Sequence, residues 1–138
     1  MIVRIAKEFR WEMGHRLPFH DGLCRNLHGH SYRLHVVVDG SLDANGMVID
    51  YFDLKRIVQP VVDELDHACI VDAGDAPLLD FFRANPLKHV VVPFTTTAEH
   101  LAQWLHQRID ERLKEELSGA RLTIRVQETE TTYAEVTG

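Results

Sequence analysis

The sequence has few cysteines, no basic tract and no long apolar run, and each of these absences excludes a class of protein. Cys24 and Cys69 are the two cysteines among 138 residues. They are too sparse for a disulfide framework and are not spaced as CxxC, so both are expected to be reduced thiols. Apolar runs such as 90–92 are far shorter than the ~20 residues of a membrane-spanning helix. A net charge of −6 without a basic tract argues against nucleic-acid partners.

What is present favours one compact domain. The hydrophobic content is 45%, which suffices for a single core over residues 1–138. Residues 1–8 alternate charged and apolar side chains and do not form a secretory signal, so a cytoplasmic location is expected. The charge is uneven, because residues 1–33 hold six Lys and Arg against three Asp and Glu. This end of the chain is therefore the one suited to an anionic small molecule.

Hydrophobic periodicity predicts an α+β fold. Alternating or β-branched stretches predict strands over 2–11, 28–39, 88–92 and 122–127, with His15 just beyond the first. A helical stripe begins near Asp53 and contains Pro60, where a kink or a restarted helix is expected. A second helix begins near Thr97 and ends at Gly119, with Thr96 and Glu99 as a capping box, and 76–84 suggests a short helix.

These elements suggest a four-stranded antiparallel sheet with two main helices on one face. The other face carries polar side chains on two of the strands. Such a face suits the wall of a solvated channel or a contact between subunits. The residues concerned are Arg33, His35, Thr123 and Arg125.

Three histidines predict a metal site. His28 and His30 are two residues apart on a strand, so their imidazoles point the same way, and a hairpin partner ending near His15 can add a third. Three histidines with an open position are typical of catalytic zinc. The alternative is that His28 and His30 form a chance pair on a polar strand face.

Other polar residues flank this site. A nearby dication would stabilise the thiolate of Cys24 as a base or nucleophile; alternatively, Cys24 is a fourth zinc ligand or a buried small side chain. Asp66 and His67 are adjacent at the end of a helix, which by itself does not imply a side-chain contact. Glu128 ends the last predicted strand, where a solvated carboxylate is the simplest interpretation.

Six motifs in register over about residues 5–133 resemble the 6-pyruvoyltetrahydropterin synthase / 6-carboxytetrahydropterin synthase family. The resemblance implies the tunnelling fold, in which four-stranded antiparallel sheets of several subunits join into a barrel. It also implies a homohexamer of two trimers with active sites at subunit boundaries. The motifs are His15-Arg16-Leu17, Cys24-x3-His28-Gly29-His30-Ser31-Tyr32, Gly46-Met47-Val48-Ile49-Asp50-Tyr51, Leu65-Asp66-His67, Thr97-Ala98-Glu99 and Gln127-Glu128-Thr129.

The resemblance also implies the roles of individual residues. His15, His28 and His30 would be the zinc ligands, Cys24 the proton-abstracting base, Asp66 and His67 an acid/base pair, and Glu128 the anchor of the pterin ring. Thr97 and Glu99 belong to a matching motif, and Glu99 either completes the helix cap or reaches a neighbouring subunit's pterin pocket. The basic bias of the N-terminal third suggests Arg16 and Arg25, with Lys88, as counter-charges for a triphosphate.

The short Cys24-x3-His28 spacing resembles the bacterial carboxy-type enzymes, whereas animal pyruvoyl-type enzymes carry a longer insert there. The implied activity is a zinc-dependent lyase that converts 7,8-dihydroneopterin triphosphate to 6-carboxy-5,6,7,8-tetrahydropterin, acetaldehyde and triphosphate in queuosine precursor synthesis. Residues 9–14, 68–71 and His100 depart from the family pattern, which leaves substrate preference open. The alternatives are the pyruvoyl-type synthase, a divergent pterin enzyme, or a non-catalytic zinc-stabilised assembly module closed by Cys24.

Overall fold

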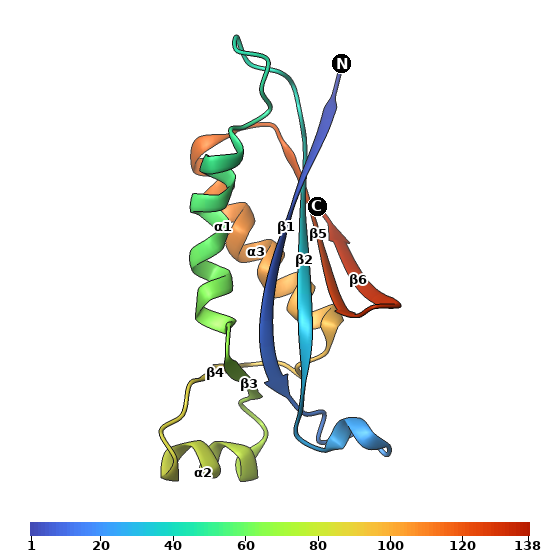
Figure 1. Cartoon of the computed structure of the whole chain (residues 1–138), viewed down its shortest axis with the longest axis vertical. Helices are drawn as coiled ribbons and strands as arrows, with labels where there is room; N and C mark the ends of the chain where they lie inside the picture. The colour runs from blue at the N-terminus through green and yellow to red at the C-terminus, as the bar shows by residue number, and fades with distance from the viewer.

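The computed structural model describes all 138 residues and contains one mixed sheet of six strands (Figure 1). The strand order is β4-β3-β1-β2-β5-β6. The pairs β1–β2, β2–β5 and β5–β6 are antiparallel, and β1–β3 and β3–β4 are parallel. The strands are β1 Val3–His15, β2 His28–Gly40, β3 Ala68–Asp72, β4 His89–Val92, β5 Arg121–Thr129 and β6 Thr132–Thr137.

The α+β class is confirmed, but the prediction of four antiparallel strands is wrong. Strands β3 and β6 were not predicted from the sequence. The five residues of β3 are buried or half-buried throughout, so they show no period-2 signal. In β6 only Ala134 and Val136 face the core and the other four residues are exposed, so the apolar alternation is too short to mark a strand. The expected barrel, in which sheets of several subunits join, stays a prediction, because the structure contains a single chain.

The long β1–β2 hairpin positions the histidines. Its register runs without a break from Val3 opposite Gly40 to His15 opposite His28. β1 therefore extends beyond the predicted end at Trp11 and includes His15 as its last residue. Burial alternates along both strands, with the histidine-bearing side facing the core.

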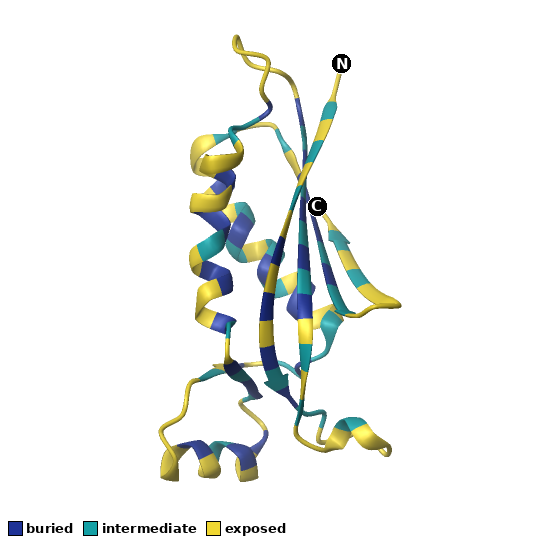
Figure 2. Cartoon of the chain, viewed as in Figure 1, coloured by how far each residue is buried: buried dark blue, intermediate teal, exposed yellow.

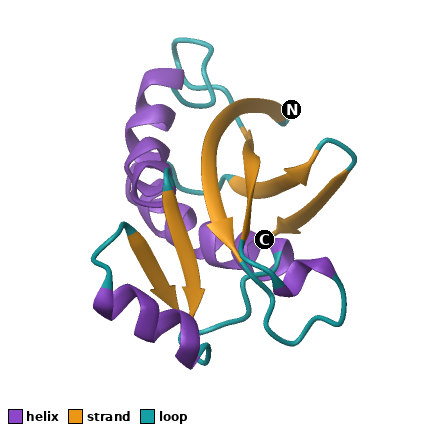
Figure 3. Cartoon of the chain, turned by 60° about the horizontal axis from the view of Figure 1, so that its bottom comes forward, coloured by secondary structure: helices purple, strands orange, loops and turns teal.

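Helices α1 (Tyr51–Leu65) and α3 (Ala98–Glu116) cover one face of the sheet, and α2 (Ala76–Ala84) matches the predicted short helix. Figure 2 shows the buried stripes of α1 and α3, and Figure 3 shows both helices behind the strands. α1 is one uninterrupted helix through Pro60, so the expected restart is wrong. Pro60 lies on the exposed side, where its missing N–H disturbs no packing.

The start of α3 differs from the predicted capping box. Thr97 is the N-cap, and its side chain accepts a hydrogen bond from the His100 N–H at 3.2 Å. Thr96 is 3% exposed and is hydrogen-bonded elsewhere, so it does not cap the helix with Glu99. The helix ends at Glu116, three residues before Gly119, whose φ of +75° suits the turn into β5.

Long stretches of sheet edge remain without a strand partner within the chain. β3 pairs with β1 only at Met13 and Gly14, so most of that edge of β1 is unpaired. β6 is the outermost strand at the other side. The chain therefore presents open edges along β1, within the sheet, and along β6, at one end of the strand order. No helix of the chain is long and apolar enough to cross a membrane.

Candidate metal centre and active site

Three imidazoles meet where the β1–β2 hairpin ends. The ligand atoms of His15, His28 and His30 all lie within 4.8 Å of one another. The ring centroids are separated by 4.7 Å for His15–His28, 4.9 Å for His28–His30 and 5.2 Å for His15–His30. The hairpin register produces this cluster, because His15 pairs directly with His28 and His30 follows on the same face.

Backbone carbonyls fix the tautomers of two of these histidines. His15 Nδ1 lies 2.8 Å from the Thr96 carbonyl oxygen, and His28 Nδ1 lies 2.7 Å from that of Asn26. A carbonyl oxygen only accepts hydrogen bonds, so both Nδ1 atoms carry the proton. The Nε2 atoms of both rings are therefore left with a free lone pair, which is the form that binds a metal.

Burial favours the neutral form of two of the three imidazoles. His15 is 1% exposed, and burial is the main cause that lowers its pKa to about 4. Burial also lowers the pKa of His30 below its ordinary value. Nε2 of His15 and of His30 are buried without a hydrogen-bond partner. Orphaned buried nitrogens are costly, and a divalent cation would satisfy them, so these residues fit a metal with three protein ligands.

Glu128, at the end of β5, lies beside the cluster. Its carboxylate oxygens are 3.6 Å from Nε2 of His30 and 3.9 Å from Nε2 of His15, and the Tyr32 hydroxyl donates to it at 3.5 Å. Glu128 also lines a cavity of about 290 Å³ beside the start of α3. Thr97 and Glu99 line the same cavity.

Asp66 and His67 do contact each other. His67 has a left-handed backbone, with φ of 60°, and its Nδ1 lies 2.9 Å from the Asp66 carboxylate. The Glu12 backbone holds the turn, because the Glu12 N–H donates to Asp66 Oδ1 at 3.0 Å and the Glu12 carbonyl accepts from the His67 N–H at 2.7 Å. The Glu12 N–H bond is the main cause that lowers the pKa of Asp66.

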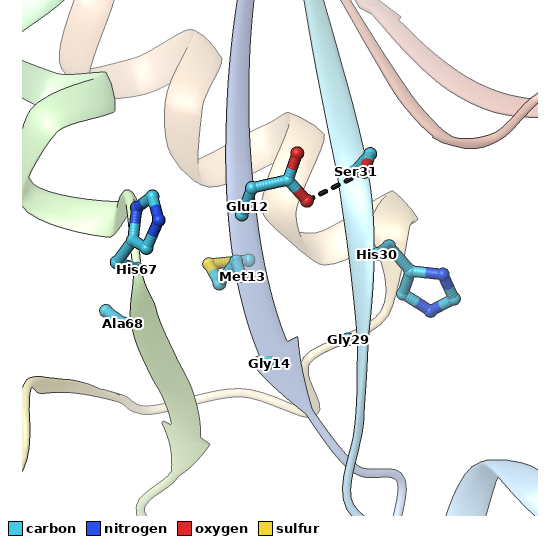
Figure 4. Close-up of a pocket in the computed structure, with 8 residues that line it drawn as sticks. All are labelled: Glu12, Met13, Gly14, Gly29, His30, Ser31, His67 and Ala68. Atoms are coloured by element: carbon cyan, nitrogen blue, oxygen red, sulfur yellow. Dashed lines mark hydrogen bonds between the residues drawn. The ribbon is translucent and has the colours of Figure 1, made fainter.

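This pair lies apart from the three-histidine cluster of its own chain. His67 lines a cavity of about 350 Å³ together with Glu12 and Ser31, whose side chains are hydrogen-bonded at 2.7 Å. Figure 4 shows His67 on the β3 side of this cavity and the His30 ring turned away from it, beyond β2. The structure therefore does not bring His67 into the cluster within one chain.

Cys24 lies on the short 3₁₀ turn η1 (Leu23–Arg25) between β1 and β2 and is half-buried. The Leu17 N–H donates to its carbonyl at 2.8 Å, which ties the loop to the end of β1. Its sulfur is not a member of the group of ligand atoms that the three histidines form. Cys24 is therefore not a fourth member of the cluster.

The basic residues considered for triphosphate binding have different environments. Arg16 donates two hydrogen bonds, of 2.6 and 2.5 Å, to the buried carboxylate of Asp75. Lys88 donates to the carbonyls of Asp63 and Asp66 at 2.8 and 2.6 Å and so caps the end of α1. Arg25 is exposed and lines a cavity of about 330 Å³ together with Arg16.

Two residues support the site through contacts that were not predicted from the sequence. Thr96 contacts His15 from 81 positions away, and Asp75 holds Arg16 from 59 positions away. The only local signal at Asp75 is that it precedes a helix with a proline in its first turn, which indicates an N-cap. Nothing in the sequence indicates the contact of Thr96 with His15, because Thr96 is one of three consecutive threonines before α3 and each of them could be its N-cap.

The fold and the site together define an α+β protein with a cluster of three histidines that could hold a metal ion. The sequence matches the family model described as 6-pyruvoyl tetrahydropterin synthase over residues 4–138, and the chain belongs to this family. The family predicted from the motifs is therefore confirmed.

Relatives of known name span most of the chain. It is 41% identical over 140 residues to a 6-carboxy-5,6,7,8-tetrahydropterin synthase of Haemophilus influenzae, covering 96% of each. It is 34% identical over 131 residues to the protein of the same name from Aquifex aeolicus, covering 80% of this chain and 81% of the relative. The fold is shared with 6-pyruvoyl tetrahydropterin synthase of Plasmodium vivax, with a TM-score of 0.82, 19% identity, and 100% and 98% coverage.

Proposed function

We propose that the protein is a metal-dependent 6-carboxy-5,6,7,8-tetrahydropterin synthase, a lyase that acts on 7,8-dihydroneopterin triphosphate. The observation that carries this proposal is the buried cluster of His15, His28 and His30, in which two Nε2 atoms have no partner. Family membership and the 41% identity to a relative of that name support the reaction. The products are 6-carboxy-5,6,7,8-tetrahydropterin, acetaldehyde and triphosphate, which places the protein in queuosine precursor synthesis.

Zinc is the metal that we propose for the three histidines. It would supply Lewis-acid chemistry that stabilises negative charge on the substrate side-chain oxygens. Fixed tautomers leave Nε2 of His15 and His28 ready to bind it. Because the cluster does not include the sulfur of Cys24, a ligand position is left for substrate, which is typical of catalytic rather than structural zinc.

The chain's own acid and base groups divide the proton transfers. We assign Cys24, on the loop next to the metal ligands, as the base that takes a proton from the substrate side chain. His67, whose Nδ1 is held by Asp66 at 2.9 Å, returns a proton elsewhere. The exposed ring of His67 and its contact with an ionised carboxylate suit a group that must exchange protons.

The pterin ring is assigned to the cavity shared by Glu128, Glu99 and Thr97. A carboxylate accepts two parallel N–H bonds from the ring amide and its amino group, which are strong because the acceptor is charged. Glu128 is the anchor, since it also borders the metal ligands. This arrangement directs the substrate side chain toward the three histidines. The triphosphate is assigned to Arg25 and Arg16, with Arg25 as the better contact because Asp75 already neutralises Arg16.

We infer that this single domain, residues 1–138, assembles into a barrel in which active sites lie at subunit boundaries. The unpaired edge of β1 and the outer edge of β6 allow strand pairing between copies. An apolar cavity of about 270 Å³ lies next to β1 and includes the exposed side chains of Met47, Tyr51 and Phe52, which a neighbour would cover. A homohexamer of two trimers would then supply His67 of one copy to the histidine cluster of another.

The test is incubation of zinc-loaded protein with 7,8-dihydroneopterin triphosphate, followed by chromatography of pterins and measurement of acetaldehyde. Acetaldehyde in equal amount to 6-carboxy-5,6,7,8-tetrahydropterin supports the proposal. A pyruvoyl product without acetaldehyde would assign the sister reaction instead, and no turnover with bound zinc would refute both. Cys24→Ala should abolish turnover, whereas Cys69→Ala, at the other free thiol, should preserve it.

A further inference from the structure

Thr96 is a buried polar residue to which the proposed reaction gives no role. It lies in the segment between β4 and α3 and is 3% exposed. Thr97 caps α3, and the Thr97 N–H donates to the Thr95 carbonyl at 2.8 Å, so the segment is held in a fixed conformation. Buried threonine hydroxyls need hydrogen-bond partners, and those of Thr96 lie at the end of β1.

Thr96 contacts the first metal ligand with two of its atoms. Its carbonyl oxygen accepts from His15 Nδ1 at 2.8 Å, and its Oγ1 lies 3.3 Å from the same nitrogen. Its hydroxyl donates to the carbonyl of Arg16 at 3.2 Å. With its hydrogen used on Arg16, Oγ1 offers a lone pair to His15. The Thr96 side chain thus fixes the position of the Thr96 carbonyl relative to the backbone of Arg16, which directly follows His15.

We propose that Thr96 is a positioning residue that sets the metal affinity of the cluster by holding the tautomer and the orientation of His15. This inference rests on the proposed metal site and deepens it. His15 is the most deeply buried of the three ligands, and no other side chain is hydrogen-bonded to its ring. Loss of an outer hydrogen bond to a ligating histidine lowers metal affinity by about 10–100-fold.

The decisive variants are Thr96→Val and Thr96→Ser. Valine keeps the shape and burial of threonine but removes the hydroxyl, while serine keeps the hydroxyl. Thr96→Val keeps the backbone carbonyl that accepts from His15 and loses the hydroxyl that holds this carbonyl in place through Arg16. We therefore expect it to raise the zinc dissociation constant in chelator competition by about 10-fold, the lower end of that range. Thr96→Ser should bind zinc within about 3-fold of the parent protein. The visible spectrum of the cobalt-loaded protein should shift in Thr96→Val and return toward the parent spectrum in Thr96→Ser.

Two control variants separate this role from a general loss of stability. Thr95→Val changes the neighbouring threonine, whose hydroxyl contacts His100 instead of a metal ligand. Thr123→Val removes a buried hydroxyl on β5 that donates a hydrogen bond to the Thr137 hydroxyl on β6. Both should retain the parent zinc affinity and cobalt spectrum. The thermal unfolding of all variants is recorded without metal, so that only folded proteins are compared.

Zinc affinity and cobalt spectrum that are unchanged in folded Thr96→Val would overturn the inference, as would equal losses in Thr96→Val and Thr95→Val. A parent protein that fails to bind zinc would instead refute the proposed metal site itself. If Thr96→Val does not fold, Thr96→Ala and Thr96→Ser are compared in its place, with the same two readouts and the same expected order of affinity.

Discussion

The three histidines that we propose as metal ligands should destabilise the protein when no metal is bound, and His30 offers the cleanest test. Its Nε2 is buried without a partner, and burial lowers its pKa, so the ring is neutral near pH 7. His30→Leu removes that nitrogen and keeps an apolar side chain of similar size. An unsatisfied buried polar group costs about 1–3 kcal/mol. The His30 side chain is 19% exposed, which places its cost near 1 kcal/mol.

The expected shift in melting temperature follows from the chain length. An unfolding entropy of about 2.1 cal/mol/K per residue gives roughly 0.3 kcal/mol/K for 138 residues. In chelator, His30→Leu should therefore melt about 3–4 °C above the parent protein. With zinc at about 100 times its dissociation constant, the parent should gain about 2.7 kcal/mol, or about 9 °C, and the variant very little.

Thermal unfolding followed by circular dichroism, with and without zinc, measures these shifts. His106→Leu is the matched control, because His106 Nε2 is already hydrogen-bonded to the Leu122 carbonyl at 3.1 Å. It should lower the melting temperature by a similar amount in both conditions. The reasoning is refuted if His30→Leu is less stable than the parent in chelator, or if zinc stabilises both proteins equally.

Three other predictions concern groups around the site. Asp75→Ala removes two bonds from Arg16 and the cap of α2, and should lower the free energy of unfolding by about 3 kcal/mol in urea titrations. The hydrogen bonds from Arg16 lower the pKa of Asp75. The stability that the Asp75 carboxylate contributes is therefore complete above about pH 4 and is lost as the pH falls through the lowered pKa. The difference in unfolding free energy between the parent protein and Asp75→Ala should shrink in that acid range. Burial raises the pKa of Cys69 to about 11, so iodoacetamide at pH 8 should label Cys24 first in peptide mass spectra, and equal labelling would contradict this. Lys88→Met removes two bonds to the end of α1 and should cost about 1 kcal/mol without changing KM, whereas a large rise in KM would return Lys88 to the triphosphate site.

The sequence predicts elements whose periodicity faces a core. The stripes of α1 and α3 and the alternation of β2 are readable for that reason, and α2 is bounded correctly at 76–84. β3 was missed because it is short and buried on both faces, and β6 because its residues are mostly polar. Tertiary packing also overrode one local rule, since α1 continues through Pro60 with the ring on its exposed side.

The candidate site also has parts that the sequence predicts and parts that it does not. The spacing of His28 and His30 predicts a shared direction on one strand, and hairpin pairing supplies His15. The supports of the site cannot be predicted, because Thr96 and Asp75 contact it from 81 and 59 positions away. Thr97 rather than Thr96 caps α3, because Thr96 is buried against His15.

The unbroken register of the β1–β2 hairpin determines where the chain tolerates changes in length. His15 and His28 pair directly, and a one-residue insertion inside either strand would turn the side chains beyond it to the opposite face. Insertions between residues 18 and 23 leave this pairing and the contact of the Asn26 carbonyl with His28 intact, and they change the position of Cys24. Evolution can thus lengthen or shorten the segment that carries the thiol while the metal ligands stay where they are.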